Sequence, residues 1–209
     1  RANAYGDVGD YDRAVEYYEK SIGMLEGVGD LVELARSYNN LGDIFIRTER
    51  YDKALAYFEK QVEISKRTGN VRIGVYAIVN AAEAMARQGG ADRLVKAEMY
   101  CKEGLSIAER LGEKSMLAFA FGALGFIFTR WREWPAAAEY FERGLEVVKD
   151  AIFPYYAADI YFEYGLMSRD SGDPGKAAHL LSEARRIYQD IGSKDGLAKV
   201  DALLEELDA

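Results

Sequence analysis

The chain has 209 residues, of which 49% are hydrophobic, and a formal net charge of −8 at pH 7. This apolar content is enough for a continuous core, whereas the acidic balance argues against direct nucleic-acid binding, which needs a basic face. No stretch approaches the roughly 20 apolar residues of a membrane span, so we expect no membrane partner.

Glycine followed by a capping residue divides the chain into helical segments. Gly29-Asp30, Gly69-Asn70 and Gly192-Ser193 each end one apolar helical run and begin the next. Glycine takes the left-handed position after a helix without strain, and Asp, Asn or Ser caps the helix that follows. No segment shows the period-two alternation of a strand. The sequence therefore predicts an all-α chain, with helices in chain order near 1–7, 11–28, 31–48, 51–68, 71–88, 92–111, 114–131, 135–150, 155–171, 175–191 and 195–207.

A pattern of an aromatic residue, Leu-Gly, and then Ala-x-x-x-aromatic recurs along these helices. Ala14 and Ala54 are 40 residues apart, and the same interval separates Ala97, Ala137 and Ala177. A fixed period in this range predicts a solenoid of stacked helix pairs, because one pair alone cannot bury its apolar face.

One repeat is longer than the others. Ala54 and Ala97 are 43 residues apart, and the three extra residues fall near 88–93. Three residues are close to one helical turn, so we interpret the insertion as a lengthened second helix. A protrusion that contacts a partner is the alternative.

These motifs resemble the tetratricopeptide repeat, in the forty-residue form of LGN-type and kinesin-light-chain-like proteins. The matching residues are the aromatics Tyr38, Phe121 and Tyr161, the Leu-Gly pairs at 41–42 and 124–125, and the five spaced alanines. The resemblance implies a right-handed superhelical α-solenoid over 1–209. Its expected repeats are 1–29 (truncated), 30–69, 70–112, 113–152 and 153–192, followed by a C-terminal capping helix at 193–209.

Residues that support catalysis are scarce. His179 is the single histidine, which excludes multi-histidine metal sites and histidine-based triads. Cys101 is the single cysteine, which excludes an internal disulfide and fits a reducing compartment. It falls at a core position, so we expect a buried thiol. We therefore predict a non-enzymatic cytoplasmic protein with no cofactor and no metal site.

The candidate binding residues lie on the first helix of each pair, which lines the concave face in tetratricopeptide arrays. Arg47, Arg87 and Arg130 each follow a crossing Gly or Ala by five residues, and Asn40 and Asn80 precede one by two. Arginine forks onto carboxylates, and asparagine amides pair with a peptide backbone. This arginine ladder predicts an extended, acidic peptide partner. Alternatively, the arginines only complement the negative ends of their helices.

The C-terminal half of the predicted groove is apolar. Phe119, Phe126 and Phe162 fall at inward offsets that hold Arg36, Asn39 and Asp43 in the first full repeat and Tyr76, Val79 and Glu83 in the second. Exposed aromatics in a concavity are typical of anchor pockets for a partner. Burial of the same rings by tight superhelical packing is the alternative.

The function that these patterns favour is a protein–protein interaction module that binds a peptide or protein segment in its concave groove. Because the chain starts at Arg1 rather than Met, we expect a piece of a longer protein. A sensor domain of a transcription regulator or signalling ATPase, responding to a peptide or small ligand, is the alternative. Self-association through the truncated N-terminal repeat edge is a third reading.

Overall fold

The computed structural model describes residues 10–149 and 153–208, and within these ranges every regular element is an α-helix. The predicted all-α fold class is confirmed, and the helix expected near 1–7 lies outside the described residues. The helices are α2 (Tyr11–Val28), α3 (Leu31–Arg47), α4 (Tyr51–Thr68), α5 (Val71–Gln88), α6 (Ala91–Leu111), α7 (Lys114–Trp131), α8 (Trp134–Val148), α9 (Pro154–Asp170), α10 (Pro174–Asp190) and α11 (Lys194–Asp208).

Local capping sets the helix boundaries. The side chain of Asp30 accepts a hydrogen bond from the backbone N–H of Glu33 at 3.2 Å, and Asn70 accepts one in the same way at the start of α5. Such a bond satisfies one of the four free N–H groups at a helix start. At the other end of α2, Gly29 has φ 79°, a left-handed conformation that glycine adopts without strain.

The inserted residues lengthen a helix. α6 has 21 residues, whereas α4, the corresponding helix of the preceding pair, has 18. The two glycines before α6, Gly89 and Gly90, have φ values of 79° and 92° and form the connection from α5. The insertion therefore adds about one turn to the second helix of its pair.

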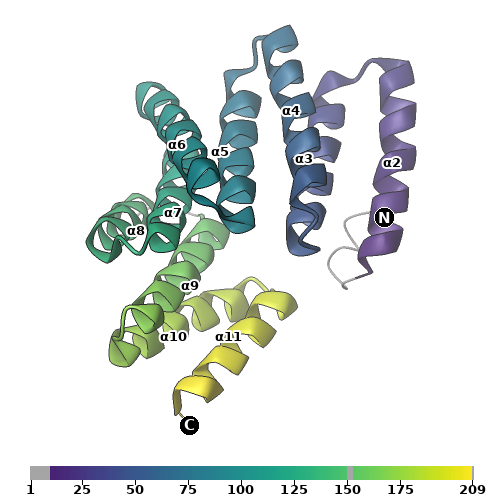
Figure 1. Cartoon of the computed structure of the whole chain (residues 1–209). Helices are drawn as coiled ribbons and strands as arrows, with labels where there is room; N and C mark the ends of the chain where they lie inside the picture. The colour runs from purple at the N-terminus through teal and green to yellow at the C-terminus, as the bar shows by residue number, and fades with distance from the viewer. Residues whose placement is uncertain (1–9, 150–152, 209) are drawn as a thin grey trace. The chain divides into compact units, whose positions relative to one another are not determined.

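The chain divides into two compact units, residues 1–100 and 101–209, and α6 crosses the division. In the first unit α2 packs on α3, α3 on α4 and α4 on α5, while α3 also contacts α5. In the second unit α7 contacts α8 and α9, and α9, α10 and α11 pack in succession. Figure 1 shows that consecutive helices within a unit run antiparallel, so α3 and α5 run in the same direction.

The recurring small residues lie where helices pack closest. A Cβ atom built on Gly125 would lie 2.5 Å from the ring of Phe141, which is closer than real contacts permit. The spaced alanines are all fully buried at 0% exposure: Ala14, Ala54, Ala97, Ala137 and Ala177. At the C-terminal end, α11 packs on α10 and buries Val200 completely. None of the helices in the described ranges is long and apolar enough to cross a membrane.

Candidate functional site

Polar side chains form a strip along the seam between α3 and α5, which are the first helices of successive pairs. Asn80 of α5 donates its amide N–H to the side-chain oxygen of Asn39 on α3 at 2.8 Å. Asn39 in turn donates to Asp43, one turn further along α3, at 3.2 Å. On α5, Arg87 donates to Glu83 at 2.8 Å. Arg47, one turn after Asp43 on α3, acts on Asp43 through its charge. We call Asn39, Asp43, Arg47, Asn80, Glu83 and Arg87 the α3–α5 strip.

The Asn39–Asn80 bond also defines the register of the two helices. Because α3 and α5 run in the same direction, the residues one turn beyond this pair also face each other across the seam. The acids at this level are Asp43, four residues after Asn39, and Glu83, three residues after Asn80. We infer that the two carboxyl groups lie opposite one another, since the charge of Glu83 acts on Asp43.

The electrostatics of Asp43 agree with this register. Burial disfavours its ionised form and raises its pKa to about 7, and the negative charge of Glu83 acts in the same direction. The positive charge of Arg47, one turn along α3, opposes both effects. Asp43 is therefore a carboxyl group that titrates near neutral pH.

The two arginines of the predicted ladder that lie in the first unit occupy equivalent places, each one turn after an acid. Arg47 lies in the last turn of α3 and is exposed. Arg87 lies in the last turn of α5, and its side chain is 32% exposed and pairs with Glu83. Both guanidinium groups are thus partly neutralised by acids of their own helices.

The two predicted asparagines have different surroundings. Asn40 donates to the hydroxyl of Tyr18 on α2 at 2.9 Å, so its amide faces the preceding helix pair. Asn80 is only 7% exposed and belongs to the α3–α5 strip. The residue that faces Asn80 is Asn39, the neighbour of Asn40. The sequence contained a signal for this strip. An acid, Asp43 or Glu83, lies four residues before each arginine, and side chains at that spacing share one helix face.

The other four predicted residues belong to the second unit. Arg130 is exposed in the last turn of α7. The Phe119 ring lies 5.8 Å from the ring of Tyr156 on α9, and Phe126 on α7 is partly buried. The Phe162 ring lies 6.4 Å from that of Tyr188 and packs on the core that α10 and α11 share. The structure therefore places the three phenylalanines in separate surroundings, each partly accessible.

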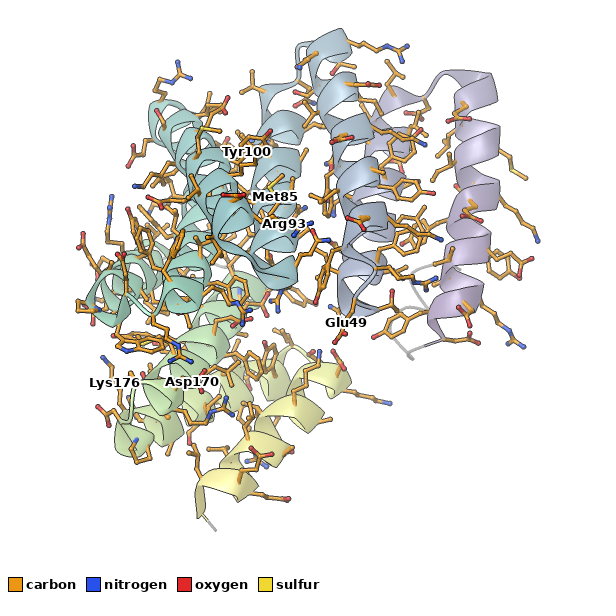
Figure 2. The ribbon with its side chains drawn as sticks, in the orientation of Figure 1. Glu49, Met85, Arg93, Tyr100, Asp170 and Lys176 are labelled. Atoms are coloured by element: carbon orange, nitrogen blue, oxygen red, sulfur yellow. The ribbon has the colours of Figure 1, made fainter. Side chains whose placement is uncertain are left out.

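Two buried tyrosines carry polar contacts at their hydroxyl ends. Tyr164 donates to Glu142 at 2.7 Å and accepts from Lys176, the α10 residue labelled in Figure 2. Tyr38 donates to Glu26 at 3.0 Å, and burial together with that carboxylate raises its pKa to about 12. Burial, with the Glu142 hydrogen bond, likewise raises the pKa of Tyr164. These contacts satisfy hydroxyl groups at the core edge and keep both phenols neutral.

Two surface hollows lie away from the predicted residues. One of about 370 Å³ lies between α2, α3 and α4, with Leu34 and Ile64 among its apolar lining. Another of about 590 Å³ lies between α10 and α11, where Arg185 pairs with Asp201. None of the eight residues predicted from the sequence lines either hollow.

The chemically reactive side chains are dispersed. Within the described ranges no three His, Cys, Asp or Glu residues come together as metal ligands. Cys101 is fully buried, and its thiol donates to the backbone oxygen of Ala120 at 3.4 Å. His179 is exposed on α10.

The sequence of the first unit matches a known family. Residues 1–67 match the family model described as tetratricopeptide repeat. Residues 1–67 therefore have the sequence pattern of tetratricopeptide repeats. The matched segment covers about a third of the chain, and the packing of successive helix pairs continues beyond it in both units. The forty-residue subtype stays a prediction.

Solved structures show the same tetratricopeptide fold. The thermophilic protein TTC0263 of Thermus thermophilus is 14% identical with a TM-score of 0.71, over 99% of this chain and 94% of that one. BtubC (BKLC) from P. vanneervenii is 21% identical with a TM-score of 0.65, over 91% of this chain and 78% of that one. A Rap protein complexed with Competence and Sporulation Factor is 13% identical with a TM-score of 0.67, over 99% of this chain and 61% of that one. No curated protein sequence matches the chain.

Proposed function

We propose that this protein is an interaction module that binds an extended, acidic segment of a partner protein along its first helices. The fold supports the general role, because stacked helix pairs present a continuous surface to a partner. The observation that carries the proposal is the α3–α5 strip. Its asparagine and arginine side chains lie along neighbouring first helices, and most remain accessible.

The chemistry of the strip suits a peptide. Asn39 and Asn80 carry amide groups that can exchange their mutual hydrogen bond for bonds to a peptide backbone, whatever its sequence. Arg47 and Arg87 supply guanidinium groups that hold carboxylates in a forked geometry. The proposed set also includes Arg130, an exposed guanidinium in the second unit, and Asn40 of α3, whose amide donates to Tyr18. A single exposed ion pair contributes only about 0–1 kcal/mol, so affinity needs several such contacts at once.

The partly accessible aromatic side chains of the second unit are the proposed anchors for apolar residues of a partner. Phe119 and Tyr156 form a ring pair that bridges α7 and α9. Phe126 lies two turns along α7 from Phe119, on the same side of that helix. Phe162 provides a third partly accessible ring.

The test compares binding of labelled ten-residue peptides that are acidic, neutral or basic. We expect the acidic peptides to bind most tightly, and the triple variant Arg47→Glu, Arg87→Glu, Arg130→Glu to lose this binding without unfolding. Arg67→Glu is the matched control, because Arg67 lies in the last turn of α4 and its replacement changes the helix-end charge in the same way. Binding should weaken as salt rises. Unchanged binding by the triple variant would reject the arginine ladder, and Phe119, Phe126 and Phe162 would be tested next.

A sensor domain is the second candidate, and the likeness to the Rap protein complexed with Competence and Sporulation Factor favours it. In that case the same face would bind a signalling molecule and transmit its binding to an attached domain. Sequencing the complete gene separates the two, since a helix-turn-helix or P-loop domain beside the repeats supports the sensor.

A further inference from the structure

The α3–α5 strip contains a carboxyl pair whose charge affects any acidic partner. Asp43 and Glu83 face each other across the seam, in the register given by the Asn39–Asn80 hydrogen bond. Arg87 pairs with Glu83 at 2.8 Å, and Arg47 lies one turn from Asp43. We propose that proton uptake by Asp43, in its place opposite Glu83, controls the binding of an acidic peptide to this strip, so that binding is tighter at mildly acidic than at mildly alkaline pH. This proposal rests on the proposed function.

The charge balance gives the direction of the effect. With Asp43 protonated, the two arginines outnumber the single carboxylate of Glu83, so the strip is positive. With Asp43 ionised, two carboxylates offset the two arginines and the strip is neutral. A negative peptide is therefore attracted more strongly to the protonated strip.

Four charged groups on or beside the other helices that pack against α3 make contacts away from this pair. On α2, Glu26 accepts the hydroxyl hydrogen bond of Tyr38. On α4, Lys60 lies over the rings of Tyr38 and Tyr57, and Lys53 lies over the ring of Phe45. In the loop before α4, Arg50 also lies over the ring of Phe45. The groups that act on Asp43 are thus Glu83 across the seam and Arg47 on its own helix.

The thermodynamic linkage between proton binding and peptide binding gives the size of the pH dependence. A peptide carboxylate placed beside Asp43 adds a second negative neighbour, which raises the pKa of Asp43 further and makes binding take up a proton. Asp43 already titrates near pH 7, so this uptake falls within the neutral range. An added shift of one to two pKa units predicts about five- to tenfold tighter binding at pH 6 than at pH 8.

The experiment measures binding of fluorescein-labelled hexa-aspartate by anisotropy at pH 6 and pH 8, at constant ionic strength. We expect the affinity at pH 6 to exceed the affinity at pH 8 by five- to tenfold, both for the unmodified protein and for Asp12→Asn, an exposed control on α2. Asp43→Asn keeps an acceptor for Asn39 and should bind tightly at both pH values, with a ratio near one. An equal ratio of the pH 6 and pH 8 affinities in the unmodified protein and in Asp43→Asn would overturn the proposed proton-controlled binding.

A second measurement separates failure of the proton-controlled binding from failure of the proposed function. The carboxyl ¹³C resonance of Asp43 is followed through a pH titration without peptide. Titration of Asp43 near neutral pH, together with the expected ratio of affinities, supports the proposal. Titration of Asp43 in the ordinary aspartate range overturns the proton-controlled binding alone. Absence of hexa-aspartate binding at both pH values, in all variants, overturns the proposed function and with it the proton-controlled binding.

Discussion

Gly42, Gly125 and Gly165 each lie against a large side chain of the following helix. Their partners are the rings of Phe58 and Phe141 and, for Gly165, the side chain of Leu181. A Cβ atom at any of the three would come unacceptably close to its partner, so a larger residue must push the helices apart. At the residue scale, the spacing of these glycines records the points where helices cross.

Gly125→Leu should lower stability by about 1–3 kcal/mol or more, because it overpacks the contact with Phe141. Circular dichroism melts of this variant are compared with those of Lys199→Ala, which removes only an exposed ion pair with Asp195. Equal melting temperatures for the two variants would mean that the repeat register is wrong.

Asp43→Asn should stabilise the protein at pH 8 and change little at pH 4. The folded state raises the pKa of Asp43 from 3.8 to about 7, so it favours the neutral form. The resulting stabilisation is complete below pH 3.8 and is lost as pH rises through about 7. Removing the ionisable group therefore recovers about 2–4 kcal/mol at pH 8.

Urea unfolding at both pH values measures this difference. Asp12→Asn is again the control, since it removes the same charge from an exposed site. A stability gain by Asp43→Asn that is as large at pH 4 as at pH 8 would contradict a raised pKa.

At the scale of the element, each helix begins and ends through its own short-range chemistry. Asp10, Asp30, Asn70 and Asp173 each accept a hydrogen bond from the backbone N–H three residues later. Glu113 precedes α7 in the same position and makes no such bond. The helices thus differ in how firmly their first turns are held.

Asp30→Ala should cost about 1 kcal/mol, because the first turn of α3 loses its side-chain cap. Glu133→Ala removes an exposed acidic side chain from the equivalent position before α8 without removing a capping bond, so it serves as the matched control. Urea unfolding of both variants measures the difference. A loss in Glu133→Ala that equals the loss in Asp30→Ala would show that helix-end charge, and not the cap, accounts for the effect.

At the scale of the whole molecule, each helix pair contacts mainly its neighbours along the chain. The contacts run from α2 to α5 in the first unit and from α7 to α11 in the second. In such repeat proteins the free energy of unfolding is close to the sum of the stabilities of the single repeats and of the interfaces between neighbouring repeats. A local defect is therefore expected to loosen its own neighbourhood most.

Gly42→Ala should increase amide hydrogen exchange in α3 and α4 more than in α9 and α10. The added Cβ meets the ring of Phe58, which belongs to α4. Exchange followed by mass spectrometry locates the change. A uniform increase over all four helices would indicate a single cooperative fold instead.

The sequence by itself determined the helical content, the approximate helix boundaries and the recurring small residues at helix crossings. Capping residues such as Asp30 and Asn70 act within three residues along the chain, so their effect is visible in the sequence. The alanine spacing likewise records helix crossings, because only small residues fit there.

Only the tertiary structure decided how the polar side chains combine. The sequence placed Asn40 beside Asn80 on equivalent positions, whereas the structure turns Asn40 toward Tyr18 and brings Asn39 to Asn80. Adjacent residues on a helix point about 100° apart, so a shift of one position changes the neighbouring helix that a side chain meets. The Asp43–Glu83 pair depends in the same way on the register of two helices joined through a third, which no local pattern specifies.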